Sequence, residues 1–255
     1  MENMTLPYSP SELASPRVEA NLAFLRDLEG RARQHGVFEH PLLVNMAEGR
    51  YSPAFVIFFL SQFAKHIRVF TAALAALLGN SPDIKSRFVL FDNLFEEMGR
   101  GDFRQCHYLL YLRMLESLGV REDDIARLPP LYAVELLNDE LFQAVTRKPF
   151  VVGLTWLGLG GELTIPDNFP RMAEAIRQAF PNTRVDWQFF ERHGGRDQMH
   201  SDDANMVLAM YLEESDWPNI EMETMKSLTA RKAVWDELES MARRGVDMHT
   251  ASLVA

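Results

Sequence analysis

The chain of 255 residues is short of cysteine, of positive charge and of linker-like sequence, and each shortage excludes a class of protein. Its single cysteine, Cys106, rules out an internal disulfide framework and fits a reducing compartment. The formal net charge of −10 argues against nucleic acid as a partner, because phosphate binding requires a basic face. Residues 1–24 contain three glutamates and no continuous apolar run, so we predict no signal peptide and a cytoplasmic location.

No repeat and no long Gly/Ser/Pro-rich stretch divides the chain, which predicts one domain over residues 1–255 with loosely ordered ends at 1–14 and 246–255. The period-two alternation of β-strands is almost absent. We therefore predict an all-α fold, a single bundle of seven to eight main helices. With the short helices included, the expected ranges are Pro16–His35, Pro41–Ala47, Ala54–Leu78, Ile84–Met98, Arg104–Leu118, Leu131–Arg147, Phe150–Leu163, Pro170–Ala179, Arg184–Glu214 and Glu221–Arg244.

The helix Ala54–Leu78 is the most apolar segment and is long enough to span a bilayer. Polar residues occupy its centre, namely Gln62, Lys65, His66 and Arg68. Charges at that depth are costly in lipid, so we predict a buried core helix and no membrane partner.

Three residues able to ligate a metal stand at positions i, i+4 and i+7 near the end of the chain: His193, Asp197 and His200. This spacing places them along one stripe of a helix. Imidazole and carboxylate are ligands that suit iron, zinc or manganese. Taken alone, the pattern also fits a solvated polar face, because other polar residues surround it.

Two earlier residues combine ligand chemistry with apolar neighbours. Glu97 ends the predicted helix Ile84–Met98, whose apolar side chains are expected to form a buried face. These side chains are Phe88, Leu90, Phe91, Leu94 and Phe95. His107 begins the next helix and is followed by several leucines, although a lone histidine of this kind is more often a hydrogen-bonded core residue than a ligand.

Glu162 closes the apolar run that starts at Phe150, far in sequence from any basic residue. A buried carboxylate needs a partner, either a metal ion or an arginine such as Arg68 from another helix. With it, the candidates are three imidazoles and three carboxylates, a set that matches two divalent ions with open positions for water, substrate or dioxygen. A ferritin-like site is excluded, because no glutamate has a histidine three residues later.

The segment from Phe91 to His107, Phe-Asp-Asn-Leu-Phe-Glu-Glu-Met-Gly-Arg-Gly-Asp-Phe-Arg-Gln-Cys-His, resembles the signature of the haem-oxygenase-like di-iron oxidases and oxygenases. Their usual run is Asp/Glu-Glu-aromatic-Gly-x-Gly-Asp with a histidine a few residues on, and only Met98 departs from it. The lone Glu162 and the later His-x-x-x-Asp-x-x-His also match in order and spacing. The resemblance covers about residues 52–210.

The resemblance implies a haem-oxygenase-like bundle that holds two Fe(2+) per chain in place of haem. The ligands of one iron would be Glu97, His107 and His193, and those of the second Glu162, Asp197 and His200. These six would form the catalytic set, activating dioxygen to N-oxygenate or oxidatively cleave a small amino-acid-derived carboxylate or amine in specialised biosynthesis. An external electron donor and a homodimer are compatible with the family. The chain has no acid between Arg50 and Asp83, so a carboxylate that some members add is missing, which predicts a looser second iron site.

The helix Ala54–Leu78 is expected to form a wall of the substrate pocket. Phe63 would help to exclude water, and Lys65 or Arg68 would hold a substrate carboxylate. A surface position for the two cations, or pairing with acids such as Glu96, explains them equally well. Two other function classes stay open: a TenA-like thiamin-pyrimidine hydrolase or cofactorless PqqC-like oxidase with the same bundle, and a non-catalytic helical interaction protein.

Overall fold

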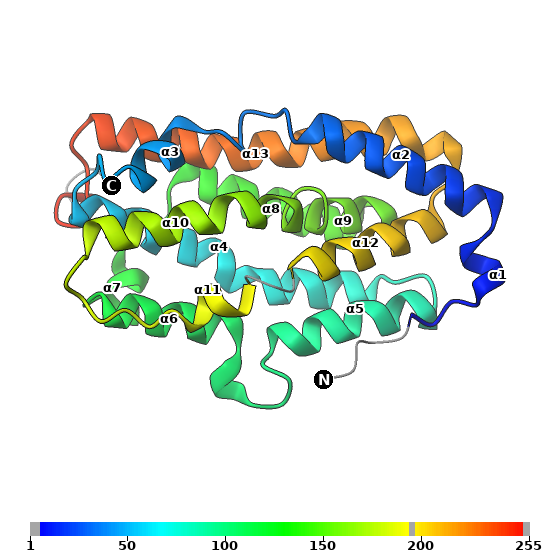
Figure 1. Ribbon diagram of the computed structural model, residues 1–255, viewed down its shortest axis with the longest axis horizontal. Helices are drawn as coiled ribbons and strands as arrows, with labels where there is room; N and C mark the ends of the chain where they lie inside the picture. Colours follow the sequence, from blue (N-terminus) through cyan, green and yellow to red (C-terminus); the bar gives the residue numbers. More distant parts are fainter. Residues whose placement is uncertain (1–5, 194–196, 252–255) are drawn as a thin grey trace.

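The computed structural model describes residues 6–193 and 197–251, with the backbone alone for 197–202. Within these ranges the chain forms helices and no strand, which confirms the predicted all-α class (Figure 1). The α-helices are α1 (Pro10–Leu13), α2 (Pro16–Ala32), α3 (Pro41–Ala47), α4 (Pro53–Gly79), α5 (Ile84–Glu97), α6 (His107–Ser117), α7 (Glu122–Arg127), α8 (Tyr132–Arg147), α9 (Phe150–Leu157), α10 (Ile165–Ala179), α11 (Gln188–His193), α12 (Asp197–Tyr211) and α13 (Trp217–Arg243). Short 3₁₀ turns are η1 (Phe103–Gln105), η2 (Glu162–Thr164) and η3 (Glu214–Asp216).

Local sequence explains why several helices start where they do. The side chains of Ser15, Ser52 and Asp83 each accept a hydrogen bond from the backbone N–H three residues on. Such caps satisfy an N–H group that has no partner inside the helix. Proline follows directly after Ser15 and Ser52, in the first helical turn, where its missing N–H costs nothing.

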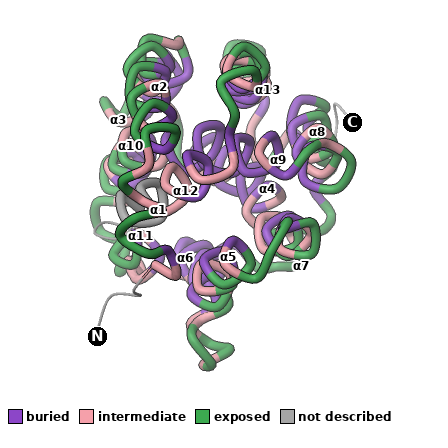
Figure 2. The backbone as a smooth tube through the Cα atoms, turned by 90° about the vertical axis from the view of Figure 1, so that its right-hand side faces the viewer, coloured by how far each residue is buried: buried purple, intermediate pink, exposed green. Residues whose placement is uncertain are grey.

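Helix α4 lies inside the bundle and packs against α5, α6 and α8 (Figure 1). Helix α13 runs along α8, α9, α2 and α3, and the inward sides of the helices are buried (Figure 2). Among the described residues α4 alone is long and apolar enough to cross a membrane. However, 56% of its apolar window is buried inside the protein, as in the core helix that the sequence predicts.

Some residues near both chain ends pack on the core, within the part of the chain that the structure describes. Tyr8, Val246 and Ala251 are at most 7% exposed. A capping box between Ser9 and Glu12 closes the short helix α1, and apolar contacts draw the residues after α13 onto the bundle.

The aromatic side chains of α5 face the opposite way from the expectation. Phe88, Phe91 and Phe95 are 49%, 54% and 39% exposed, whereas Val89 and Leu90 are buried. Both sides of this helix are apolar, so periodicity alone does not tell which side meets α4. The side that turns inward also carries Glu96 and Glu97.

Three expected helix boundaries are wrong near the site. Helix α9 ends at Leu157, so Glu162 lies on the 3₁₀ turn η2. Helix α10 starts at Ile165 and includes Pro170 in its interior. The helix expected over Arg184–Glu214 begins only at Gln188, as α11, and ends at Tyr211, as α12; residues 194–196 lie outside the described residues.

Candidate metal centre

A tight turn after α5 brings Glu97 beside the start of α6. Gly99, Arg100 and Gly101 have φ angles of 82°, 50° and 90°, the left-handed region that glycine adopts without strain. A Cβ on Gly99 would lie 2.3 Å from the backbone oxygen of Asp102, so this position also requires glycine for space. The loop projects from the bundle and returns, so α5 and α6 lie end to end and the end of α5 meets the start of α6 (Figure 1).

Glu97 and His107 are both buried and face each other across this turn. Glu97 Oε1 lies 2.9 Å from His107 Nδ1. Within the described residues His107 Nδ1 makes no hydrogen bond. An oxygen and a nitrogen that approach without a shared hydrogen bond have the arrangement of two ligands of one ion.

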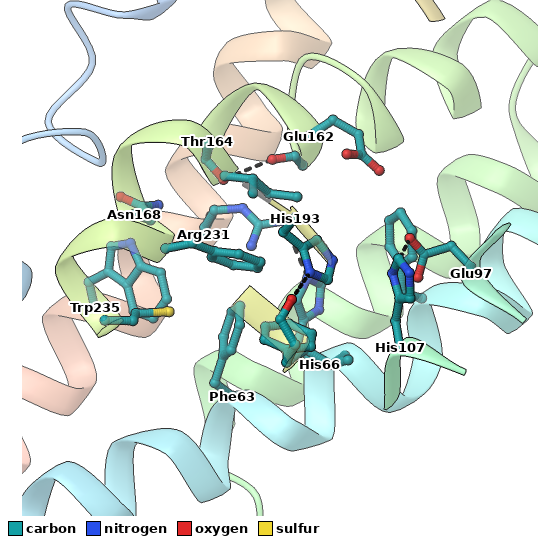
Figure 3. A pocket seen from close by; sticks show the side chains of 17 residues that line it. Phe63, His66, Glu97, His107, Glu162, Thr164, Asn168, His193, Arg231 and Trp235 are labelled. Carbon is teal, nitrogen blue, oxygen red and sulfur yellow. Dashed lines mark hydrogen bonds and ion pairs between the residues drawn. The ribbon is translucent and has the colours of Figure 1, made fainter. Parts of the chain in front are cut away.

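His193, at the end of α11, completes a group of three. Its ring lies 4.7 Å from that of His107, and the ligand atoms of Glu97, His107 and His193 lie within 4.8 Å of one another (Figure 3). His193 Nδ1 donates a hydrogen bond to the carbonyl of Phe189 at 2.7 Å, which leaves the lone pair on Nε2. Such a bond to the second ring nitrogen orients the histidine ligands of metal sites. The donor set therefore fits a divalent ion such as iron.

A cavity of about 60 Å³ adjoins these three side chains. Glu162, 5% exposed on η2, lines the same cavity. Figure 3 shows its carboxylate on the side of Glu97 and His107. The structure thus brings four of the six candidate ligands to one cavity. The side chains of the remaining two, Asp197 and His200, lie outside the described residues.

The cavity wall formed by α4 differs in part from the expected one. Phe63, His66, Ile67 and Phe70 line the cavity, as residues spaced by three and four on one helix face do. Lys65 and Arg68 lie on other faces of α4. Lys65 Nζ donates to the carbonyl of Ile125 at 2.9 Å, and Arg68 is exposed. Neither Lys65 nor Arg68 lines this cavity, so a contact of either cation with a substrate stays a prediction.

The cation at the cavity is Arg231 of α13, which sequence reasoning missed. It is 8% exposed, and its Nε donates to the carbonyl of Gly160 at 3.0 Å. Its Nη2 lies 3.2 Å from His66 Nε2, while His66 Nδ1 lies 2.7 Å from Asn138 Oδ1. The amide oxygen accepts the proton on Nδ1, so Nε2 accepts from the guanidinium.

Burial shifts the pKa values of both partners. It lowers the pKa of His66 to about 3, helped by the charge of Arg231, so this imidazole is neutral at physiological pH. Burial also lowers the pKa of Arg231 to about 10, against the attraction of the Glu162 carboxylate. Arg231 remains a cation under the same conditions.

Residues 57–234 of the chain match the family described as iron-containing redox enzymes. A 4-aminobenzoate synthase from Chlamydia muridarum is 22% identical over 194 residues, which cover 75% of this chain and 80% of that protein. A CADD-like protein of unknown function from Nostoc punctiforme superposes with a TM-score of 0.75 at 17% identity, over 88% of this chain and 99% of that one.

A domain with a haem-oxygenase-like fold from Shewanella denitrificans superposes with a TM-score of 0.63 at 18% identity, over 91% of this chain and 96% of that one. The bundle therefore has the haem-oxygenase-like fold, as the resemblance implied.

Proposed function

The chain belongs to the family of iron-containing redox enzymes, and from this premise we propose that it is a non-haem oxygenase or oxidase using two ferrous ions and dioxygen. One observation carries the proposal: Glu97, His107 and His193, from three different helices, gather their ligand atoms within 4.8 Å in a buried place. Two neutral imidazoles and one carboxylate leave open positions on a ferrous ion for dioxygen and substrate.

In the proposed site the first ion is held by Glu97, His107 and His193. Glu162 faces the same cavity and would hold the second ion with Asp197 and His200. Bound iron would supply the activation of dioxygen, a step that no protein side chain performs. The protein's own part is to orient the ligands and to exclude water. The rings of Phe169 and Phe189 serve the second task, packed at 5.1 and 4.3 Å from that of His193.

The substrate is proposed to be a small amine or carboxylate. The cavity is small and mostly apolar, with the buried cation Arg231 in its wall. The name of the chlamydial relative adds 4-aminobenzoate as a product to assay. Iron-loaded protein incubated with oxygen, a reductant and small amine or carboxylate substrates would be analysed for this compound by mass spectrometry.

A hydrolase of the TenA type is less well supported. Cys106 is the only thiol available as a nucleophile, and its Sγ donates to the carbonyl of Met98 at 3.1 Å. Burial raises the pKa of this thiol, which disfavours the reactive thiolate. A hydrolase would turn over without oxygen and would lose activity in Cys106→Ala.

The direct test is an anaerobic titration of metal-free protein with ferrous iron. The proposal expects saturation near two equivalents, followed by oxygen consumption on exposure to air. Saturation near one equivalent would remove the second site and keep the first. Protein that binds no iron, or that binds iron without consuming oxygen under any reducing condition, would contradict the proposal.

A further inference from the structure

Arg231 carries a positive charge that makes no ion pair with a carboxylate of the described residues, although the charge of Glu162 attracts it at longer range. Its two nearest polar partners, the carbonyl of Gly160 and His66 Nε2, are neutral. His66 Nε2 is fixed as a hydrogen-bond acceptor, because the other ring nitrogen, Nδ1, donates to Asn138 Oδ1. Burying a cation without a close anion is unfavourable, so such a charge persists where an anion binds.

Two more polar atoms in the cavity wall lack hydrogen-bond partners. Trp235 Nε1 and Asn168 Oδ1 are unpaired within the described part of the chain, and their residues are 1% and 2% exposed. Buried polar groups are nearly always hydrogen-bonded, and those left unpaired point to a missing water, ion or ligand. In Figure 3, Asn168 and Trp235 lie on the side of the cavity away from Glu97 and His107.

The fold places these groups together through two helices. Arg231 and Trp235 are four residues apart on α13 and therefore lie on one face of it. Asn168 comes from α10, and all three line one cavity. Arg231 and Trp235 offer N–H donors, which match a carboxylate. Asn168 Oδ1 is an acceptor, which matches an adjacent N–H or O–H group.

We propose that Arg231, Trp235 Nε1 and Asn168 Oδ1 form a subsite for an α-amino acid, with the first two on its carboxylate and the third on its ammonium group. The inference rests on the proposed function, because the bound molecule would be the substrate oxidised at the iron ligands. A cavity of about 60 Å³ holds several waters, because about 10–15 Å³ of such space holds one, so it favours a small molecule.

The test measures the binding of the common L-amino acids, each against its own carboxamide, by calorimetry on metal-free protein and on ferrous protein under anaerobic conditions. The carboxamide keeps the ammonium group and removes the negative charge. We expect at least one amino acid to bind about tenfold more tightly than its carboxamide. Arg231→Met should weaken the binding of that amino acid about tenfold or more, and Arg231→Lys should weaken its binding less.

Trp235→Phe provides a second variant that retains the ring and removes only the N–H, in case Arg231→Met fails to fold. Trp235→Phe should weaken the binding of the amino acid several-fold. The matched control Arg26→Met removes an exposed arginine of α2 and should bind like the wild type. Ferrous binding should be unchanged in all these variants, because none of the substituted residues is a proposed ligand.

Three results would overturn the subsite: no amino acid binds, an amino acid and its carboxamide bind equally, or Arg231→Met and Trp235→Phe both bind like the wild type. The first would mean that the unpaired groups hold ordered water only. Normal ferrous binding alongside any of these results would leave the iron site standing. Amino-acid binding to a protein that takes up no iron would instead refute the proposed function and keep the subsite.

Discussion

The two ends of the cavity present opposite chemistry to whatever lies between them. At one end Glu97, His107 and His193 gather oxygen and nitrogen lone pairs, which attract a cation. At the other end Arg231 and Trp235 present N–H groups, which attract an anion. With a metal bound, the first end would itself accept an electron pair at an open position on iron. The two ends would then differ in how they bind a donor: iron through a lone pair, and Arg231 with Trp235 through hydrogen bonds to an anion.

The two ends also differ in how they are assembled. Glu97 and His107 are ten positions apart and are joined by one turn, so local sequence specifies their approach. Arg231 meets His66 across 165 positions of sequence, which only the packing of α13 near α4 achieves. We therefore expect the first pair to depend on the turn and the second to depend on close contact between helices.

The largest effect should come from removing a proposed ligand. His107→Ala or His193→Ala should weaken the binding of the first ferrous ion by about 100-fold or more. Losing only a group that is hydrogen-bonded to a ligand already lowers metal affinity about 10- to 100-fold. An anaerobic ferrous titration measures this loss. His249→Ala, which removes an exposed histidine, is the matched control and should titrate like the wild type.

The same titration compares the two ends of the cavity. Arg231→Met should bind both ferrous ions normally while His193→Ala does not. Equal loss of iron in the two variants would show that the ends form one coupled unit rather than two separable sites.

A smaller effect is expected where α9 approaches α13. A Cβ on Gly160 would lie 2.2 Å from Ser227 Oγ and 2.7 Å from the carbonyl of Trp156. Gly160→Ala should therefore lower the free energy of unfolding by about 1–3 kcal/mol and displace the carbonyl that Arg231 binds. Urea denaturation measures the change.

A glycine of α2 provides the control for this substitution. Nothing lies within 4 Å of a Cβ built on Gly30, so Gly30→Ala should stabilise by up to about 1 kcal/mol. If Gly160→Ala were as stable as Gly30→Ala, the backbone at the contact between Gly160 and Ser227 would shift at little cost in free energy. The anion-binding end would then be less rigid than we infer.

The sequence indicates the end of the cavity with Glu97 and His107 more directly than the other end, because its signal is local. The Gly-Arg-Gly turn, the paired glutamates and the following His107 stand within one short segment. Proline and serine at helix starts likewise located α2 and α4 to within a few residues. Glu162 was singled out as a carboxylate in an apolar run, although the turn η2 that carries it was not foreseen.

The remaining features depend on which helix faces meet, and periodicity does not contain that information. Arg231 stands in a mixed polar helix in which nothing distinguishes it from Arg243 or Lys232. Lys65 and Arg68 stand out in the apolar sequence of α4, yet each is only one residue away from a cavity-lining residue, His66 or Ile67. The prediction that the aromatic side of α5 is buried is wrong for the same reason, since both sides of this helix are apolar.

The pH dependence of stability should reveal the state of His66. Its pKa falls from 6.5 to about 3 on folding, so the unfolded chain binds the extra proton between these values. The contribution of neutral His66 to the free energy of unfolding is fully present above pH 6.5 and is lost as the pH falls toward 3. The loss is at most about 1.4 kcal/mol per pH unit. His66→Gln removes the proton site, so wild type should lose stability faster than the variant between pH 6 and 4.

Urea unfolding at pH 7, 6, 5 and 4 measures this difference, and His249→Gln is the control because that ring is exposed. Parallel curves for wild type and His66→Gln would show that His66 is protonated in the folded protein. Arg231 would then face a like charge, and the anion-binding end would need a different account.

The smallest effects are expected for the two cations of α4 that lie away from the cavity. Arg68→Ala should change the free energy of unfolding by no more than about 0.5 kcal/mol, because its side chain is exposed. Lys65→Met should cost about 1 kcal/mol through the lost bond to the Ile125 carbonyl. Neither substitution should alter amino-acid binding in calorimetry, since no part of either side chain lines the cavity. If either variant weakened amino-acid binding as much as Arg231→Met does, the carboxylate of the substrate would be bound by residues of α4 and not by those of α13. The proposed subsite on α13 would then be wrong.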